Sequence, residues 1–421
     1  MNSIQPIFPG KLCGTVSLPT SKSISARALV MSTLAGSGEL SNLSDCDDTE
    51  VLREALTLRQ PTIDIHAAGT AMRFATAYFA TCPGETHIIT GSDRMQHRPI
   101  QVLVEALRQL GAKIEYLGQE GFPPLRIQGD HLHGGRVELP ANVSSQYISA
   151  LLMIGPVLQE GLRLHLIGEV VSRPYIDMTV GLMKAFGAEA RWSSDHELVV
   201  LPQPYTPGLH FKVEPDWSGA SYWYEMVALA DDSASRVVLP SLSAHSWQGD
   251  SIVEQLFRHL GVATTFENGA AVLTKVPVPT EKSLLEIDFT TCPDLAQTFV
   301  VTCAVLGQPF RFRGLQSLRI KETDRIAALQ KELQKLGILL TSSQSYDEQL
   351  GQPTEILEMM APQSINTEGN TTIDTYDDHR MAMAFAPVAM RCPGIRIEHP
   401  EVVSKSYPSF WKDLVQLGVQ I

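Results

Sequence analysis

Residues 110–114 of this chain read LGAKI, a joint at which a helix-forming run meets a glycine and continues as a strand-like run. The same joint recurs as FGAEA at 186–190, LGVAT at 260–264 and LGILL at 336–340. The glycines concerned are Gly111, Gly187, Gly261 and Gly337. Each stands where the end of a helix needs a residue in the left-handed backbone conformation. The joints are typical of α/β proteins in general, and their spacing also suggests a repeated strand–helix–strand unit.

Outward from these joints, short apolar runs alternate with amphipathic runs along the whole chain, which predicts an α/β fold. The strand-like runs are 14–18, 85–90, 113–116, 163–167, 197–201, 236–239 and 270–275. The helical runs are 23–35, 69–80, 100–111, 144–157, 176–186, 219–230, 250–260, 322–336 and 378–390. A chain of 421 residues exceeds the usual size of a single core, so two domains are expected.

Composition and charge exclude other classes of protein. The net charge of −13 argues against a nucleic-acid binder, which needs a basic surface. No uninterrupted apolar run is long enough for a membrane span, and the first residues do not form a signal peptide. The six cysteines are scattered, without metal-binding spacing, which is typical of a reducing compartment. We therefore expect a cytoplasmic protein with no membrane or nucleic-acid partner.

Polar residues and cations gather at the predicted helix starts. The groups are Lys22-Ser23 with Arg27, Gly69-Thr70 with Arg73, Ser144-Ser145-Gln146, Lys321-Glu322 with Arg325, and Asp378-His379-Arg380. Helix N-termini carry unpaired N–H groups and partial positive charge, so this pattern predicts sites for phosphate and carboxylate groups. The alternatives are ordinary N-caps and surface ion pairs, with Arg325 on Glu322 and Arg380 on Asp377 or Asp378.

Residues 21–27, SKSISAR, resemble the S-K-S-x-S-x-R signature of the 5-enolpyruvylshikimate-3-phosphate synthases. Further segments resemble motifs of that family and follow in the family's order. They are AGTAMR at 68–73, RMQHRPI at 94–100, SSQ at 144–146, SRPYID at 172–177, PD at 293–294, KETDR at 321–325, DHRMAM at 378–383 and KSYP at 405–408. The resemblance thus covers essentially the whole chain.

The resemblance implies a fold of two similar α/β domains, each of three repeated βαββαβ units, with helices inside as in an inside-out α/β barrel. It places the active site in the interdomain cleft. The implied domains are a discontinuous C-terminal-type domain, 1–20 plus 214–421, and an N-terminal-type domain, 21–213. A monomer is expected.

The implied reaction transfers the enolpyruvyl group of phosphoenolpyruvate to the 5-hydroxyl of shikimate 3-phosphate, through a tetrahedral intermediate, and releases phosphate. This is a step of the shikimate pathway to aromatic amino acids. One alternative is the related transferase that acts on UDP-N-acetylglucosamine. That relative commonly carries a Cys before its R-P segment, and none occurs in residues 91–98. The other alternative is a non-catalytic anion-binding homologue.

The resemblance also implies roles for individual residues. Those implied for shikimate 3-phosphate are Lys22, Ser23, Arg27, Ser144, Ser145, Gln146, Ser172, Tyr175, Asp294 and Lys321. Those implied for phosphoenolpyruvate are Lys22, Gly69, Thr70, Arg98, Gln146, Arg325, Arg380 and Lys405. The reaction needs a base for the hydroxyl and an acid for C3 of the enol, for which Asp294 and Glu322 are the candidates, with Lys22 beside the reacting oxygen.

Glu322 needs a dry site that raises its pKa if it is to act as an acid. His379 is either a further participant or a structural partner of Asp378. No metal or organic cofactor is called for.

The sequence departs from the family pattern at four places. Thr20 stands for a usual Gly, His66-Ala67 for Gly-Asn, and Phe74 for a Pro, and the stretch before the glycine loop is short. These changes leave open the geometry of that loop and, with it, sensitivity to the inhibitor glyphosate.

Overall fold

The computed structural model describes residues 3–141, 143–168, 170, 172–278, 282–347, 352–366 and 370–421. The chain divides into two compact units. We call Thr20–Glu214 the middle unit, and Met1–Pro19 with Pro215–Ile421 the split unit. Among the described residues, no helix is both long and apolar enough to cross a membrane.

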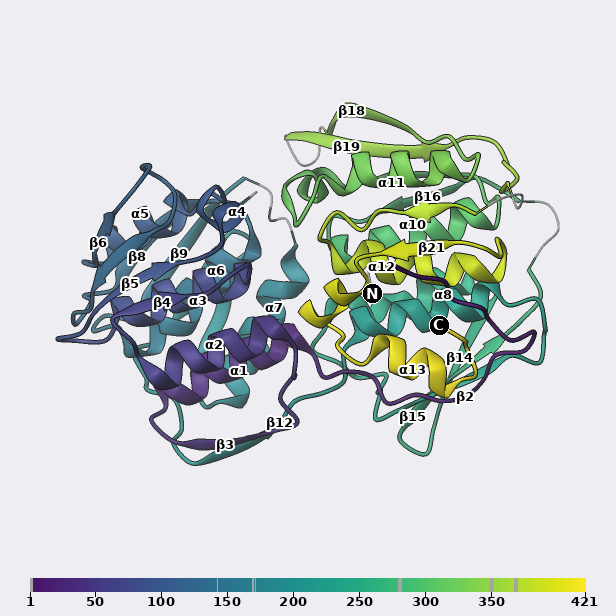
Figure 1. The fold of residues 1–421 in the computed structure, drawn as a ribbon. Helices are drawn as coiled ribbons and strands as arrows, with labels where there is room; N and C mark the ends of the chain where they lie inside the picture. Colours follow the sequence, from purple (N-terminus) through teal and green to yellow (C-terminus); the bar gives the residue numbers. More distant parts are fainter. Residues whose placement is uncertain are drawn as a thin grey trace. The chain divides into compact units, whose positions relative to one another are not determined.

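The middle unit contains seven α-helices and ten strands within the described ranges (Figure 1). Its helices are α1 (Lys22–Leu34), α2 (Asp47–Leu58), α3 (Gly69–Ala80), α4 (Asp93–Gln96), α5 (Gln101–Gln109), α6 (Ser145–Ile154) and α7 (Arg173–Ala185), with the 3-10 turn η1 (Gly155–Val157). Its strands are β3 (Gly38–Ser41), β4 (Thr62–Asp64), β5 (Thr86–Thr90), β6 (Lys113–Tyr116), β7 (Leu125–Gln128), β8 (Gly135–Pro140), β9 (Leu162–Ile167), β10 (Ala190–Ser194), β11 (Glu197–Val200) and β12 (Leu209–Lys212).

The split unit begins with two short strands from the N-terminus and continues after the middle unit. Its helices are α8 (Trp217–Leu229), α9 (Val253–Arg258), α10 (Ala296–Val305), α11 (Arg325–Lys335), α12 (His379–Phe385) and α13 (Phe410–Gln416). Its 3-10 turns are η2 (Gly249–Ile252), η3 (Pro293–Leu295), η4 (Gln316–Ile320), η5 (Ala386–Met390) and η6 (Pro400–Lys405). Its strands are β1 (Ser3–Ile4), β2 (Cys13–Thr15), β13 (Arg236–Pro240), β14 (Val262–Glu267), β15 (Ala270–Lys275), β16 (Leu285–Asp288), β17 (Phe310–Arg313), β18 (Thr341–Asp347), β19 (Gln352–Met359), β20 (Thr372–Ile373) and β21 (Arg396–Glu398).

One sheet topology occurs four times among the described strands, twice in each unit. A parallel pair is followed by two strands that add antiparallel, as in β4-β5-β7-β6 and β8-β9-β11-β10 of the middle unit. The split unit repeats it in β2-β13-β15-β14 and β16-β17-β19-β18. Each unit has a third, smaller sheet, β12-β3 in one and β1-β21-β20 in the other. The repeat suggested by the Gly joints is therefore present.

The fold class is confirmed, with one correction to the order of elements. The chain runs β8, α6, β9, α7, β10, β11, which is β-α-β-α-β-β and not the expected β-α-β-β-α-β. The reason is the parallel first pair: two parallel neighbours need a crossover helix between them, whereas the last two strands join as a hairpin. The four joint glycines have φ values of +102°, +85°, +80° and +82°, so the prediction of left-handed backbone is confirmed.

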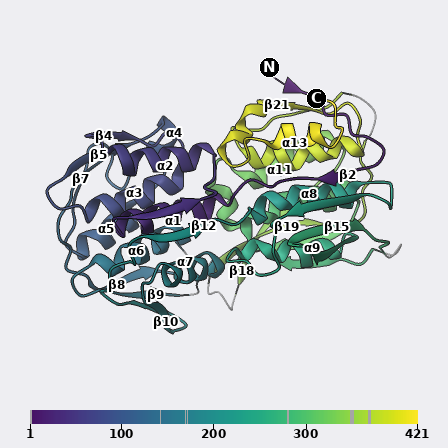
Figure 2. The same ribbon diagram turned by 90° about the horizontal axis from the view of Figure 1, so that it is seen from below.

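Helices fill the inside of each unit and sheets lie outside them (Figures 1 and 2). In the split unit α8, α10 and α12 pack on one another, and every residue of α10 and α12 is buried. In the middle unit α1, α3 and α6 pack together in the same way. These helices are buried on nearly all sides, and most of their residues are apolar, as expected for an element surrounded by protein. Each unit has its own hydrophobic core.

The predicted helices are present, and their observed ends differ from the predicted ones where a capping residue or a change to a 3-10 turn sets the boundary. The prediction 69–80 coincides with α3. The predicted helix 322–336 begins only at Arg325, because the Asp324 carboxylate accepts a hydrogen bond from the Ala327 N–H and caps the helix there. The predicted helix 378–390 ends as α at Phe385 and continues as the 3-10 turn η5.

Gly129, which directly follows β7, provides a test of the packing between α3 and its sheet. An added Cβ would lie 1.9 Å from the carbonyl oxygen of Cys82 and 2.7 Å from that of Phe79, both backbone atoms after or at the end of α3. We expect Gly129→Ala to lower the free energy of unfolding by about 1–3 kcal/mol, because backbone has to shift. Urea unfolding measures this. The control is Gly118→Ala, where the nearest atom, in Pro124, is 3.7 Å away; equal stabilities of the two variants would contradict the prediction.

Candidate active site

A buried guanidinium organises the polar residues of the split unit. Arg325, the first residue of α11, is only 1% exposed. Its Nε donates to Oδ2 of Asp378 at 2.8 Å and its Nη2 donates to Oε2 of Glu322 at 2.8 Å, while Nη1 lies 3.6 Å from Oδ1 of Asp294. A buried charge is tolerated only when it is paired and hydrogen-bonded, and three carboxylates provide this here.

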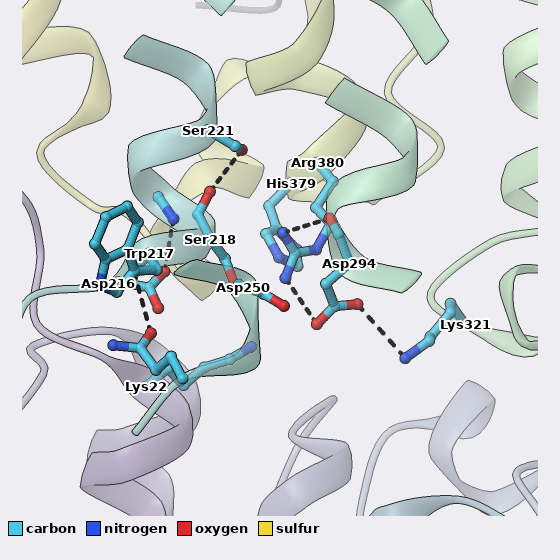
Figure 3. A network of polar contacts seen from close by, with 12 residues as sticks. Lys22, Asp216, Trp217, Ser218, Ser221, Asp250, Asp294, Lys321, His379 and Arg380 are labelled. Atoms are coloured by element: carbon cyan, nitrogen blue, oxygen red, sulfur yellow. Dashed lines mark hydrogen bonds and ion pairs between the residues drawn. The ribbon is translucent and has the colours of Figure 1, made fainter. Parts of the chain in front are cut away.

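Asp294, in η3 just before α10, is shared by three cations. Its Oδ2 lies 3.0 Å from Nη2 of Arg380, and its Oδ1 lies 3.6 Å from Nζ of Lys321 (Figure 3). The same Oδ1 lies 3.6 Å from Nη1 of Arg325. Burial by itself raises the pKa of this carboxyl group, but the positive charges of Arg380, Lys321 and Arg325 outweigh burial. They hold the pKa of Asp294 well below its ordinary value.

Glu322 lies in the turn before α11 and joins a fourth cation to this cluster. Its Oε1 is 3.3 Å from Nζ of Lys405, and both side chains are 15% exposed. The pair of Arg325 with Glu322 is therefore present but is not a surface pair, because Arg325 is buried and Glu322 is half-buried. For Arg380 the surface-pair alternative is wrong, since its guanidinium, 9% exposed, contacts Asp294.

Asp378 links two elements of the same cluster. Its side chain is fully buried, and Oδ1 accepts the backbone N–H of Arg380, which caps α12. The same carboxylate binds Arg325 of α11. His379 is buried beside it, with Nδ1 3.8 Å from Oδ1 of Asp378. The split unit thus brings together Asp294, Lys321, Glu322, Arg325, Arg380 and Lys405 from η3, the turn before α11, α11, α12 and η6.

In the middle unit the predicted residues also lie at helix starts. Lys22 is the first residue of α1, and its Nζ lies 3.1 Å from Oδ2 of Asp48, near the start of α2. Ser23 follows it, half-buried. Ser21 caps α1 by accepting the N–H of Ile24. Asp48 was not predicted as a partner of Lys22. The one sequence feature that could have indicated it is the pair of acidic residues, Asp47 and Asp48, at the start of α2.

Arg27 is buried, without a carboxylate partner among the described residues. Its Nε donates to Oγ1 of Thr179 at 2.7 Å and its Nη2 to Oγ of Ser149 at 3.0 Å, on α7 and α6. Its guanidinium lies 5.4 Å from the ring of Phe74, the residue that replaces the family's proline. Burial lowers the pKa of Arg27 to about 10, so the group still carries its charge at neutral pH. Sequence reasoning did not find Ser149 or Thr179, because both look like ordinary helix residues.

The glycine loop and the following R-P segment lie side by side. An ideal Cβ on Gly69 would be 2.7 Å from Nη1 of Arg98, so only glycine leaves the guanidinium in this place without a shift. Thr70 accepts a hydrogen bond at 3.1 Å from Nε2 of Gln146, which joins the starts of α3 and α6. His66 and Ala67, where the sequence departs from the family, are exposed.

The predicted phosphate-binding serines stand at the starts of α6 and α7. Ser144 caps α6 by accepting the N–H of Gln146, and Ser145 is the first residue of that helix. Ser172 precedes α7 in the left-handed conformation, with φ of +59°. Tyr175 is half-buried in the first turn of α7. Helices α6 and α7 pack on each other, and each of the three hydroxyl groups stands at the start of one of these two helices.

This geometry defines a class: a repeat-built α/β protein with cations and hydroxyl groups at the starts of its central helices, suited to small polyanions. The chain belongs to the EPSP synthase (3-phosphoshikimate 1-carboxyvinyltransferase) family, whose sequence profile matches residues 54–414. The resemblance inferred from the sequence motifs is thereby confirmed.

Relatives of full length support the assignment. The chain is 55% identical over 414 residues to the 3-phosphoshikimate 1-carboxyvinyltransferase of Bacteroides fragilis strain YCH46, covering 98% of this chain and 97% of the relative. It is 34% identical over 446 residues to the enzyme of that name from Vibrio cholerae serotype O1 strain M66-2, covering 99% of both chains. The structure of EPSP synthase from Acinetobacter baumannii matches the fold with a TM-score of 0.74 at 21% identity, covering 99% of this chain and 98% of that one.

The depressed pKa of Asp294 predicts a dependence of stability on pH. A carboxyl group with a lower pKa in the folded than in the unfolded chain stabilises the fold above its unfolded pKa, and this stabilisation is lost as the pH falls. Relative to Asp294→Asn, the parent should therefore keep a constant difference in unfolding free energy from pH 7 to 5 and lose stability below about pH 4. Urea unfolding followed by tryptophan fluorescence measures it, since Trp217, Trp223, Trp247 and Trp411 report on the split unit. A difference that stays constant to pH 3 would show that Asp294 is not held by these cations.

Proposed function

We propose that this chain transfers the enolpyruvyl group of phosphoenolpyruvate to the 5-hydroxyl of shikimate 3-phosphate and releases phosphate, with Asp294 and Glu322 as the proton-transfer residues. The observation that carries the proposal is that both carboxylates contact the guanidinium of Arg325, at 3.6 and 2.8 Å. Around this pair stand the other cations of the split unit expected for the substrates, which are Lys321, Arg380 and Lys405.

The charges explain how a carboxylate can serve as base here. Arg325 and Arg380 are assigned to the phosphoenolpyruvate carboxylate and Lys321 to the phosphate of shikimate 3-phosphate. All three cations contact Asp294. When substrate anions share these cations, less positive charge acts on Asp294, and its pKa rises towards its ordinary value. Asp294 then accepts the proton of the 5-hydroxyl as its oxygen adds to C2.

Glu322 is assigned the opposite role, delivery of a proton to C3. Two of its partners, Arg325 and Lys405, are residues assigned to the phosphoenolpyruvate carboxylate and phosphate. As these cations turn to the ligand, the half-buried carboxyl group faces added negative charge, which favours its protonated form. Protonation of C3 completes the tetrahedral intermediate. Loss of phosphate and return of a methyl proton to the carboxylate then form the product.

The middle unit is assigned the remaining contacts. Ser144, Ser145 and Ser172 offer hydroxyl donors for the shikimate phosphate, and the buried Arg27 with Ser23 offers a planar fork for the shikimate carboxylate. Gln146 and Tyr175 are assigned to the shikimate ring. The residues assigned to phosphoenolpyruvate here are Gly69, Thr70, Arg98 and Gln146, and Lys22 is assigned to the reacting oxygen. The catalytic protein would use 1–20 plus 214–421 and 21–213 as its two domains.

Location and assembly complete the proposal. We place the enzyme in the cytoplasm, where its cysteines stay as thiols; all six are free, and all but Cys13 are buried. We also propose a monomer, since each unit completes a hydrophobic core from its own residues. Light scattering after size exclusion measures the mass directly.

A two-substrate assay tests the proposed reaction. Purified protein should release phosphate from phosphoenolpyruvate only when shikimate 3-phosphate is present. Release with UDP-N-acetylglucosamine in its place would assign the chain to the sibling activity. No release with either acceptor would leave an anion-binding homologue.

Two variants test the assigned proton transfers. Asp294→Ala and Glu322→Gln should each lower turnover by roughly 10²–10⁴-fold, the usual contribution of a positioned acid or base, while both ligands still bind. Asp324→Asn is the matched control: it changes a carboxylate next to the same segment, and asparagine still caps α11. Near-parental turnover in either active-site variant would remove the role assigned to that residue.

A further inference from the structure

The turn that leads into α12 has an unusual backbone. Tyr376 and Asp377, which directly precede the cap residue Asp378, have φ values of +52° and +54°. Two consecutive residues other than glycine in the left-handed region are disfavoured and persist only where surrounding contacts hold them. The contacts that hold this turn therefore also set the position of Asp378 and of Arg380 behind it.

Glu332 of α11 makes contacts with this turn from the inside. Its side chain is fully buried. Oε1 accepts the hydroxyl of Tyr376 at 2.5 Å, and Oε2 accepts the backbone N–H of Asp374 at 3.1 Å. Lys335 supplies the countercharge, with Nζ 2.5 Å from Oε2, and also donates to the carbonyl of Thr372 at 3.0 Å. Oε1 therefore binds the segment between β20 and α12. Oε2 binds both that segment and Lys335 of α11.

The same helix holds the other end of the turn. Arg325 lies about two helical turns before Glu332 on α11, which places both side chains on one face. Arg325 binds Asp378 through Nε and Nη2 at 2.8 and 3.3 Å. The strained turn is therefore fastened to one helix at two places, Glu332 on the Asp374 and Tyr376 side and Arg325 on the Asp378 side.

We propose that Glu332 and Tyr376 are positioning residues for the reaction: they fix the turn 374–378 and thereby the placement of the guanidinium groups of Arg325 and Arg380 that receive phosphoenolpyruvate. Among the described residues, the side-chain hydrogen bonds of Glu332 and Tyr376 are made to one another, to Asp374 and to Lys335, none of which is assigned to a substrate. Glu332 acts through Tyr376 and the backbone of Asp374, and the turn acts through Asp378, which binds Arg325 and caps the helix of Arg380. The expected effect on kinetics rests on the proposed function. The claim that Glu332 and Arg325 hold the turn rests on the contacts alone.

Tyr376→Phe is the sharpest test, because it removes one hydroxyl and keeps the ring, which lies 5.3 Å from Nζ of Lys331. We expect KM for phosphoenolpyruvate to rise roughly 10-fold, as is usual for a small misplacement of positioning groups. KM for shikimate 3-phosphate should stay within about twofold, since most of its assigned contacts lie on other elements. Glu332→Ala should have the larger effect, and Glu332→Gln, which still accepts hydrogen bonds, should restore part of the loss.

Tyr224→Phe is the matched control. Tyr224 is another tyrosine of the split unit, more deeply buried than Tyr376, and its hydroxyl is 2.9 Å from Oγ1 of Thr264, outside the cluster around Arg325. Its variant should show a comparable change in melting temperature and unchanged kinetics. Equal KM values for phosphoenolpyruvate in the Tyr376→Phe and Tyr224→Phe proteins would overturn the positioning role.

Hydrogen exchange gives a readout that does not depend on activity. In the parent, amides of 374–382 should be protected, and Tyr376→Phe should speed their exchange while the rest of α11 is unaffected. If the parent releases no phosphate with the two substrates, the proposed function fails. Hydrogen exchange then tests by itself whether Tyr376 holds the turn 374–378. Unchanged protection of these amides in Tyr376→Phe would overturn that claim.

Discussion

The split unit depends on one buried positive charge. Removing a guanidinium from water is costly, and Arg325 is stabilised only because Asp378, Glu322 and Asp294 come to it from three different segments. Each segment is placed by this contact: Asp378 starts α12, Glu322 lies before α11, and Asp294 lies before α10. Three of the elements that carry the site are therefore held in register by electrostatics, on a scaffold whose helices are otherwise fixed by apolar packing.

Arg27 of the middle unit is the opposite case. It is as buried as Arg325, yet the groups that satisfy its guanidinium are hydroxyls, a carbonyl and the face of an aromatic ring. These partners satisfy the hydrogen bonds of Arg27 without neutralising its charge, so the guanidinium can still attract an anion. An acidic protein with a net charge of −13 can in this way keep positive potential at particular helix starts. Two buried guanidinium groups are thus stabilised differently: Arg325 by carboxylates, and Arg27 by uncharged hydrogen-bond acceptors.

Local patterns in the sequence were enough to predict an α/β fold, the left-handed glycines and helices such as α3, since each depends on neighbours along the chain. The two-domain repeated fold was implied by the family resemblance. Pairings between residues far apart in the sequence were not predicted. Strand β2 pairs with β13 and β1 with β21, across the whole middle unit, and no periodicity reveals such partners. At the site, charged and hydroxyl residues in motifs could be nominated, but Asp48, Ser149 and Glu332 could not. Their importance comes from what the fold places next to them.

Under the proposed function, the charge arrangement around Asp294 would also make the chemistry depend on occupancy by both substrates. Its three cations are those assigned to different ligands: Lys321 to shikimate 3-phosphate, and Arg325 and Arg380 to phosphoenolpyruvate. On the proposed roles, one bound ligand would leave other cations to hold the pKa of Asp294 down, and the carboxylate would stay a weak base. With both anions on their cations, the pKa would rise and Asp294 would become able to take a proton. A residue held in check by the binding groups of two substrates would thus protect phosphoenolpyruvate from attack by water until the proper hydroxyl is in place.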